Sequence, residues 1–330
     1  MNHNYDFIAI GDVVTDAFIR LKDPSAHIDI DHGRREICMR FAEKIPYEEV
    51  YVVPAVGNSP NAAVAAAKLG LKSALVSNLG DDYFGKECLN ALRQAGVATD
   101  FIRTHKGVKT NYHYVLWYLD DRTILIKHEE YPYILPEINS PKWLYLSSLG
   151  GHSLDFHSMI ESYLESHPDV KMAFQPGTFQ MKLGREKLEY FYKRSNVFLC
   201  NREEAQRILG TAEEEIKNLM TLLHRIGPKI IVVTDGPKGA YTYDGNEMWF
   251  MPPYPDPKPP YERTGAGDAF SSTFVAAVAL GLDIPTALKW APINSMSVVQ
   301  KVGAQAGLLT RPQLEKYLEE ASQEYQPKKI

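Results

Sequence analysis

The sequence has few cysteines and no excess of positive charge. Its three cysteines, Cys38, Cys88 and Cys200, lie far apart and form no CxxC pair. Scattered thiols of this kind are typical of reduced residues, so we expect a cytoplasmic protein. The net charge of −5 at pH 7 offers no basic surface for nucleic acid or an anionic membrane. We therefore expect neither of these partners.

Long apolar runs and metal-binding histidine patterns are also missing. No apolar stretch reaches the length of a membrane span. A strand-like run begins already at residues 7–10, so we expect no signal peptide. The ten histidines show neither HxH nor HExxH spacing, so we expect no histidine-bound metal.

What the chain does contain is an alternation of short apolar runs with helical patterns. Its 330 residues are 45% hydrophobic and 23% charged, which is enough for a substantial core. The predicted strands are 5–11, 73–78, 143–147, 171–175, 197–201 and 229–234. The predicted helices are 60–69, 83–95, 153–167, 203–209, 213–226, 267–280, 284–302 and 311–324. Such an alternation predicts an α/β fold with a mostly parallel sheet covered on both faces.

Two stretches interrupt this rhythm, at approximately residues 18–56 and 104–132. Within the second, residues 110–128 alternate as a β-hairpin would. Together the two stretches predict a small sheet that acts as a lid, with a static extension of the main sheet as the alternative. We expect one domain over residues 1–330 with these two insertions. The exposed edges of the small sheet suggest a homodimer formed through it.

The most informative motif is ERTGAGDAF at residues 262–270, which leads into a helix rich in small residues. Gly265, Ala266 and Gly267 let a ligand approach the backbone closely. The N-terminus of the helix then forms an anion site. Asp268 would repel a phosphate that was merely bound, but it suits a base that takes a proton from a hydroxyl attacking that phosphate. The alternative is an ordinary helix N-cap.

Candidate acceptor-binding residues follow the first strand and precede the first helix. Asp16 lies just beyond residues 5–11, where open α/β sheets bind ligands, although Asp12 competes with it on position alone. The segment Gly57-Asn58-Ser59-Pro60-Asn61 starts an alanine-rich helix. The Asn61 amide could bind a polyhydroxy substrate or simply lie in the first turn at the surface.

Two further turns are candidates for phosphate, metal and nucleotide contacts. Asn201 and Glu204 have the spacing of a capping box, and alternatively orient the water shell of Mg²⁺. Residues 234–240 (TDGPKGA) end a strand in a turn with two glycines, whose backbone could contact a nucleotide together with Thr234.

Taken in this order, these motifs resemble the PfkB family of carbohydrate kinases, also called the ribokinase family. The resemblance rests on residues 57–61 with Gly70, 80–85 with 96–97, the Asn201/Glu204 pair, 234–239 and, most strongly, 264–270. It covers almost the whole chain. It implies a ribokinase-like three-layer α/β/α sandwich with a small β-sheet lid, and ATP-dependent transfer of the γ-phosphoryl group to a hydroxyl of a sugar or sugar-like molecule.

The resemblance also implies a role for each candidate residue. Asp268 would be the catalytic base and Gly265–Gly267 the anion hole. The acceptor would be bound by Asp16, Gly57, Asn58 and Asn61. The nucleotide would be bound by Asn201, Thr234, Gly236, Gly239, Asn294 and Gly303. Glu204 and Asn201 would hold Mg²⁺ through water.

Departures from the family pattern leave the acceptor open. Glu262 replaces an aspartate associated with a monovalent cation, which argues against potassium activation. Val56 and Asn58 alter the amino-terminal signature, which argues against ribokinase itself. A nucleoside could stack on Tyr112, Tyr114, Trp117 or Tyr118, and a sugar acid could pair with Arg34, Arg35 or Arg122. A non-catalytic nucleotide- or sugar-binding regulator is the alternative from another class.

Overall fold

The computed structural model describes residues 5–22, 26–31, 34–119 and 121–330, with only the backbone of Arg34. Their main feature is a ten-stranded sheet of order β16-β15-β14-β13-β12-β11-β10-β1-β6-β7. Neighbours from β7 to β13 pair in parallel, and those from β13 to β16 pair antiparallel. Its strands are β1 (Phe7–Ile10), β6 (Ser73–Gly80), β7 (Ile102–His105), β10 (Trp143–Leu146), β11 (Lys171–Phe174), β12 (Val197–Asn201), β13 (Ile230–Thr234), β14 (Ala240–Tyr243), β15 (Met248–Met251) and β16 (Lys328–Lys329).

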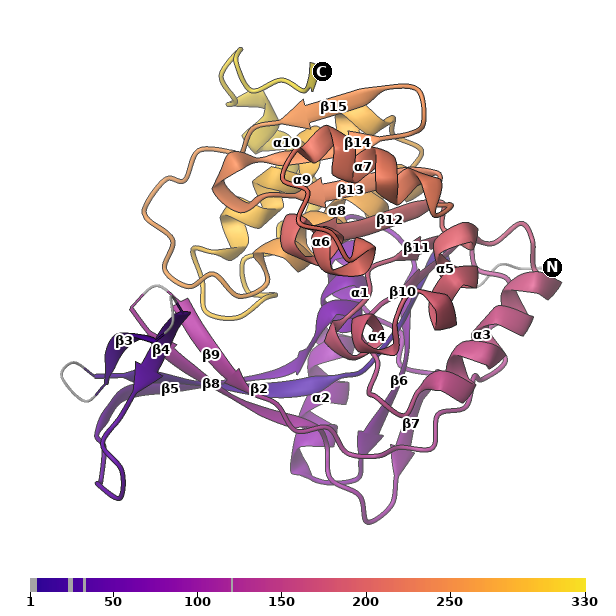
Figure 1. Ribbon diagram of the computed structural model, residues 1–330. Coiled ribbons are helices and arrows are strands. Elements are labelled where there is room, and N and C mark those ends of the chain that lie inside the picture. The colour runs from indigo at the N-terminus through magenta and orange to yellow at the C-terminus, as the bar shows by residue number, and fades with distance from the viewer. Residues whose placement is uncertain (1–4, 23–25, 32–33, 120) are drawn as a thin grey trace.

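Helices cover both faces of this sheet, as Figure 1 shows. One face is covered by α1 (Asn58–Lys68), α2 (Tyr83–Gln94), α8 (Ala266–Ala279), α9 (Ile284–Val298) and α10 (Arg311–Glu319). The other is covered by α3 (Leu154–Ser166), α4 (Thr178–Leu183), α5 (Glu189–Arg194), α6 (Arg202–Leu209) and α7 (Ile216–Arg225). The predicted three-layer α/β/α sandwich is confirmed.

The apolar strands have two buried faces because successive side chains point to opposite sides of a sheet. In β1, Phe7 and Ala9 pack in the core beneath α1 and α8, whereas Ile8 and Ile10 pack beneath α3. In β13, Val232 belongs to the first core and Ile231 to the second. This two-sided burial explains why the strands read as continuous apolar runs.

A separate four-stranded sheet, called the small sheet below, has the order β5-β2-β8-β9. Its strands are β2 (Val14–Leu21), β5 (Tyr47–Val56), β8 (Tyr112–Tyr118) and β9 (Asp121–Leu125). The hairpin of β3 (His27–Asp31) and β4 (Arg34–Cys38) lies at its far end in Figure 1. Because the small sheet has its own hydrogen-bond ladder, it is not an extension of the main sheet's edge.

Some element bounds differ from the sequence prediction for local reasons. Helix α9 ends at Val298 instead of 302, and the chain then turns at Gly303, which has a φ of +80°. Helix α7 begins at Ile216 instead of 213, because the Glu213 side chain accepts hydrogen bonds from Glu215 N and Asn218 Nδ2. Strands β14 and β15 were not predicted. In the described part of the chain, no helix is both long and apolar enough to cross a membrane.

Candidate active site

Two cavities meet beyond the carboxyl ends of the parallel strands. The first, of about 420 Å³, lies between the small sheet and the ends of β10 to β13, and we call it the acceptor cavity. The second, of about 540 Å³, lies between the 234–240 turn and α9, and we call it the nucleotide cavity. Thr234, Arg263 and Gly267 line both. The cleft thus has two compartments with a common junction at the start of α8.

Gly265 sets the direction in which α8 starts. It has a φ of +84°, and a Cβ on it would lie 2.3 Å from Ala304 Cβ. Before it, Glu262 is buried, and its Oε1 accepts hydrogen bonds from Thr264 N at 2.7 Å and Thr264 Oγ1 at 2.5 Å. The hydrogen bond from Ala269 N to Gly265 O closes the first turn. Gly265 lines the acceptor cavity, Ala266 the nucleotide cavity and Gly267 both, so the start of the helix lies where the two cavities meet.

Asp268 is half-buried in the first turn of α8 and lines the acceptor cavity. Asn61 Nδ2 donates to its Oδ2 at 2.8 Å, and Gln175 Nε2 donates to its Oδ1 at 3.2 Å. Burial raises the pKa of this carboxyl, while the two amides act against the rise by hydrogen bonding the charged form. Each carboxylate oxygen keeps a lone pair for another donor, such as a substrate hydroxyl.

Asp12 and Asp16 both line the acceptor cavity but differ in what they contact. The Tyr133 hydroxyl donates to both carboxylate oxygens of Asp12 at 2.8 Å, and His128 Nδ1 lies 3.3 Å from its Oδ2. Asp16 Oδ1 is buried 3.4 Å from His113 Nδ1, and it has no hydrogen-bond partner among the described residues. Asp16 therefore has more capacity to accept a hydroxyl than Asp12 has.

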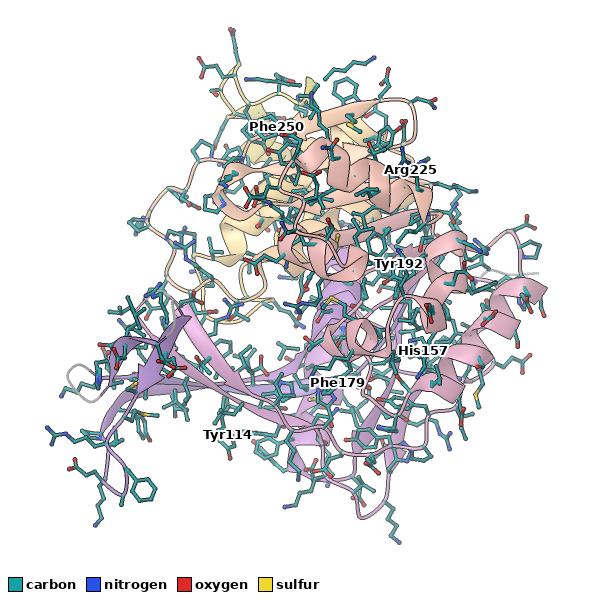
Figure 2. All side chains as sticks on the ribbon, in the orientation of Figure 1. Tyr114, His157, Phe179, Tyr192, Arg225 and Phe250 are labelled. Carbon is teal, nitrogen blue, oxygen red and sulfur yellow. The ribbon has the colours of Figure 1, made fainter. Side chains whose placement is uncertain are left out.

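A row of three rings forms one wall of the acceptor cavity. The His113 and His128 ring centroids are 5.2 Å apart, and those of His128 and Phe179 are 5.3 Å apart in an edge-to-face arrangement. Phe179 is at the start of α4, and Figure 2 shows it in the middle of the molecule, where the small sheet meets the rest of the chain. Asn58 and Gly57 line the same cavity from the start of α1.

Asn201 and Glu204 form the predicted capping box and also face the acceptor cavity. Asn201 Oδ1 accepts from Glu204 N at 2.8 Å, and Glu204 Oε2 accepts from Asn201 N at 2.9 Å. Burial raises the pKa of Glu204, and the Asp268 charge raises it further. Capping occupies one oxygen of each side chain, so Glu204 Oε1 still has acceptor capacity.

The nucleotide cavity has a mostly apolar lining. Thr234, Gly236 and Gly239 line it at one side, the proline-rich segment 252–260 at another, and Phe270 of α8 below. A Cβ on Gly239 would lie 2.5 Å from Met251 O, so the turn requires glycine there. Such a lining suits the faces of a flat heterocycle.

Two residues expected at the nucleotide are not among the residues that line either cavity. Asn294 is fully buried between α8 and α9, where its Nδ2 donates to Thr273 Oγ1 and its Oδ1 accepts from Leu309 N, both at 2.8 Å. Gly303 lies against Val53 of β5. Its neighbour Ala304 does line the acceptor cavity.

The aromatic side chains of β8 that were candidates for base stacking do not line the acceptor cavity. Tyr114 is exposed, and Figure 2 shows it on the side of the small sheet away from the rest of the chain. Trp117 is buried beneath the Arg20 guanidinium, 4.8 Å from its ring centroid, and packs edge-to-face on Tyr261. Tyr112 packs against Phe84 with the two rings tilted. The aromatic side chains that do line the acceptor cavity are those of the ring row, His113, His128 and Phe179.

Among the three arginines considered for a sugar acid, only Arg122 lines the acceptor cavity. Arg35 lines a smaller cavity of about 150 Å³ between β4 and β9. The side chain of Arg34 lies outside the described residues. Of the arginines considered and described, Arg122 is therefore the one placed to meet a carboxylate in the acceptor cavity, and Arg263, which was not considered, lines it as well.

Several site residues were missed in the sequence. Gln175 directly follows β11, so it could have been predicted from the rule that ligands bind beyond the strand ends. Tyr133, the two histidines and Gln305, whose Nε2 donates to Asn61 Oδ1, carry no local signal. They reach the site through contacts between distant segments, as when β2 places Asp16 beside His113 of β8.

Comparisons with known proteins agree with this architecture. A model of the "pfkB family carbohydrate kinase" matches residues 28–311. The chain is 29% identical to ribokinase of Bacillus subtilis over 79% of its own length and 87% of that protein. It is 27% identical to 5-dehydro-2-deoxygluconokinase of B. subtilis over 81% and 87%. The structure of Arabidopsis thaliana ribokinase complexed with ribose and ATP superposes with a TM-score of 0.79 at 20% identity, covering 96% of this chain and 99% of that one.

Proposed function

Since the chain belongs to the pfkB family of carbohydrate kinases, we propose that its cleft transfers the γ-phosphoryl group of ATP to a hydroxyl of a sugar or sugar-like molecule. One observation carries this proposal. Asp268 lies in the first turn of α8 and lines the cavity of carboxylates and amides, directly after Gly267, which lines the apolar cavity as well. An acceptor in one cavity and a nucleotide in the other would meet beside this carboxylate.

In this mechanism Asp268 takes the proton from the attacking hydroxyl. The Asn61 and Gln175 amides hold its carboxylate in place, and burial raises its pKa, which makes it a stronger base than an exposed aspartate. The backbone N–H groups of Gly265, Ala266 and Gly267 stabilise the charge that develops on the transferred phosphoryl group. Asp16 accepts a second hydroxyl of the substrate and so orients it.

The residues present fit a magnesium ion that is held mainly by phosphates and water. No cluster of three or more His, Cys, Asp or Glu side chains suited to a metal occurs in residues 5–22, 26–31, 34–119 and 121–330. Glu204 instead offers one half-buried carboxylate near Asp268, where a cation would relieve the repulsion between the two negative charges. Bound Mg²⁺ would neutralise charge on the phosphates. Glu204 and Asn201 would orient its water ligands.

The acceptor is a polyhydroxy compound in this proposal, and a nucleoside is the second candidate. The ring row of His113, His128 and Phe179 favours the nucleoside, because aromatic faces bind flat bases. The open carboxylate of Asp16 serves a free sugar and a ribose moiety equally. One relative is named 5-dehydro-2-deoxygluconokinase, and for a sugar acid in this cavity Arg122 would bind the carboxylate.

A panel of acceptors tests this function. ADP release from Mg·ATP is measured with free pentoses and hexoses, sugar acids and nucleosides. Acceptor-dependent release supports a kinase and identifies the substrate class. ATP binding without release on any acceptor would favour the non-catalytic regulator.

We also propose that the small sheet mediates a homodimer. Val52, Ala17, Tyr114 and Leu125 are paired across all four strands and so lie on the same face of the small sheet. Val52, Tyr114 and Leu125 are 50%, 49% and 51% exposed, whereas Ala17 between them is buried. Exposed apolar side chains that share a face are typical of contact surfaces. Sedimentation should give a dimer that Val52→Asp converts to a monomer, and a monomeric wild-type protein would contradict the proposal.

A further inference from the structure

The Asp268 carboxylate depends on the direction in which two neutral amides face. Asn61 comes from α1 and Gln175 from the end of β11, and each directs its NH₂ group at a different oxygen of Asp268. An amide turned by half a rotation has nearly the same shape but exchanges its NH₂ group for its oxygen. If either amide turned, its oxygen would face a carboxylate oxygen, and a hydrogen bond would become a repulsion.

The Asn61 amide is held in direction by Gln305. Gln305 Nε2 donates to Asn61 Oδ1 at 2.9 Å and to the backbone oxygen of Ala55 at 2.7 Å. Both acceptors lack a proton to give, so only the NH₂ end of Gln305 can face them. Ala55 itself is held at the end of β5, with a φ of +61° and its N–H on Cys88 Sγ at 3.2 Å. The oxygen of Asn61 is therefore held away from Asp268.

The oxygen of the Gln175 amide contacts Tyr145. The Tyr145 hydroxyl, fully buried on β10, can both donate and accept, and here it donates to Gln175 Oε1. Burial and the nearby Asp268 charge raise the pKa of Tyr145 well above its usual value, so the phenol keeps its proton. The NH₂ group of Gln175 is left to face Asp268.

We propose that Gln305 and Tyr145 are positioning residues for phosphoryl transfer, which fix the Asn61 and Gln175 amides so that both donate to Asp268. Neither touches the substrate in this proposal. Each acts through one amide, and together they keep the base in a single orientation. The inference rests on the proposed function, because it assigns their effect to a base at Asp268.

The test compares substitutions of Gln305 in two backgrounds. Gln305→Glu keeps the size of the side chain but replaces the donor by an acceptor, so Asn61 should turn its NH₂ group toward position 305. Gln305→Met also removes the donor, but its side chain does not attract the NH₂ group of Asn61. With the acceptor that turns over fastest in the panel, kcat should fall by about 10–100-fold in Gln305→Glu, as expected when a hydrogen bond to a charged group is lost. The fall should be smaller in Gln305→Met, and KM for ATP should be unchanged in both.

In the Asn61→Ala background neither substitution should lower kcat further, because the amide through which Gln305 acts is gone. A loss of the same size in both backgrounds would mean that the new charge acts directly, and it would overturn the proposal. Gln300→Glu is the matched control. Gln300 follows the same helix and its Nε2 donates to a backbone oxygen, that of Lys258, at 3.0 Å. Because this contact does not involve Asn61, kcat of Gln300→Glu should equal that of the wild type.

Urea unfolding gives a readout that needs no acceptor. Gln305→Glu should have a lower urea midpoint than Gln305→Met, and the difference should shrink in the Asn61→Ala background, where only the contact with the Ala55 backbone oxygen remains. A difference of equal size in both backgrounds would contradict the proposed contact with Asn61. Tyr145→Phe is compared in the wild-type and Gln175→Ala backgrounds in the same way.

Asp268→Asn separates failure of this inference from failure of the proposed function. If Asp268→Asn lowers kcat but Gln305→Glu does not, only the positioning role is wrong. If Asp268→Asn has no effect on kcat, the proposed function itself is wrong.

Discussion

Gly267→Ala should stabilise the protein and weaken ATP binding at the same time. Gly267 lies in the first turn of α8 and lines both cavities, and a Cβ on it would have no atom within 4 Å. Replacing a helical glycine by alanine gains about 0.5–1 kcal/mol. For a chain of this length, an unfolding entropy of about 2.1 cal/mol/K per residue converts this gain to a rise of roughly 1 °C in Tm. The new methyl group would occupy the space through which the phosphates approach the helix amides.

Two measurements separate these effects. Calorimetric unfolding should show the small rise in Tm. Titration calorimetry with Mg·ATP should show a Kd about 10–100-fold higher, the cost of losing one hydrogen bond to a charged phosphate. Unchanged ATP affinity would refute the argument that the phosphates pass over Gly267.

Two other glycines at the ends of α8 serve as comparisons. Gly265→Ala should cost about 2–5 kcal/mol of folding stability, because its positive φ and its contact with Ala304 both oppose a side chain. Gly281 follows the far end of α8 with a φ of +88° and open space around it. Gly281→Ala should therefore lower Tm through backbone strain while leaving the Kd for ATP unchanged.

Three further predictions follow from the charged groups of the acceptor cavity. Because burial raises the pKa of Asp268 and a base must be ionised, kcat should fall on acidification through a pKa above the usual aspartate value of about 3.9, and a pH–rate profile with its acidic limb at or below that value would disagree. Asp16→Asn should raise the acceptor KM about 10–100-fold, whereas Asp12→Asn should mainly lower Tm, because tyrosine and histidine partners already occupy Asp12; equal effects on KM would contradict this distinction. Glu204→Gln should raise the Mg²⁺ concentration needed for half-maximal turnover at fixed ATP, and an unchanged Mg²⁺ titration would remove Glu204 from the metal site.

The layered fold and the start of α8 could be predicted because their signals are local. The apolar runs of the parallel strands are long enough to require burial on both faces, and the glycines before Asp268 restrict the backbone within a few residues. Asp16 could be predicted from the rule that ligands bind beyond the strand ends, and Asp268 from the glycine motif that precedes it at the start of a helix. The sequence is therefore sufficient to predict the position of the cleft.

The surroundings of Asp268 could not be predicted, because they depend on contacts between distant segments. Gln305 reaches Asn61 only because α9 ends early and the following loop returns under β5. His113 reaches Asp16 only through the parallel register of β2 and β8. Asn294 shows the opposite case, since its polar side chain on an apolar helix is accounted for by hydrogen bonds within the core.

The most direct test of the central claim compares acceptor-dependent ADP release by the wild-type protein and by Asp268→Asn. General-base catalysis contributes about 10²–10⁴-fold, so kcat of the variant should fall by that factor while its Kd for Mg·ATP stays the same. An Asp268→Asn variant that turns over its acceptor as fast as the wild type would contradict the account.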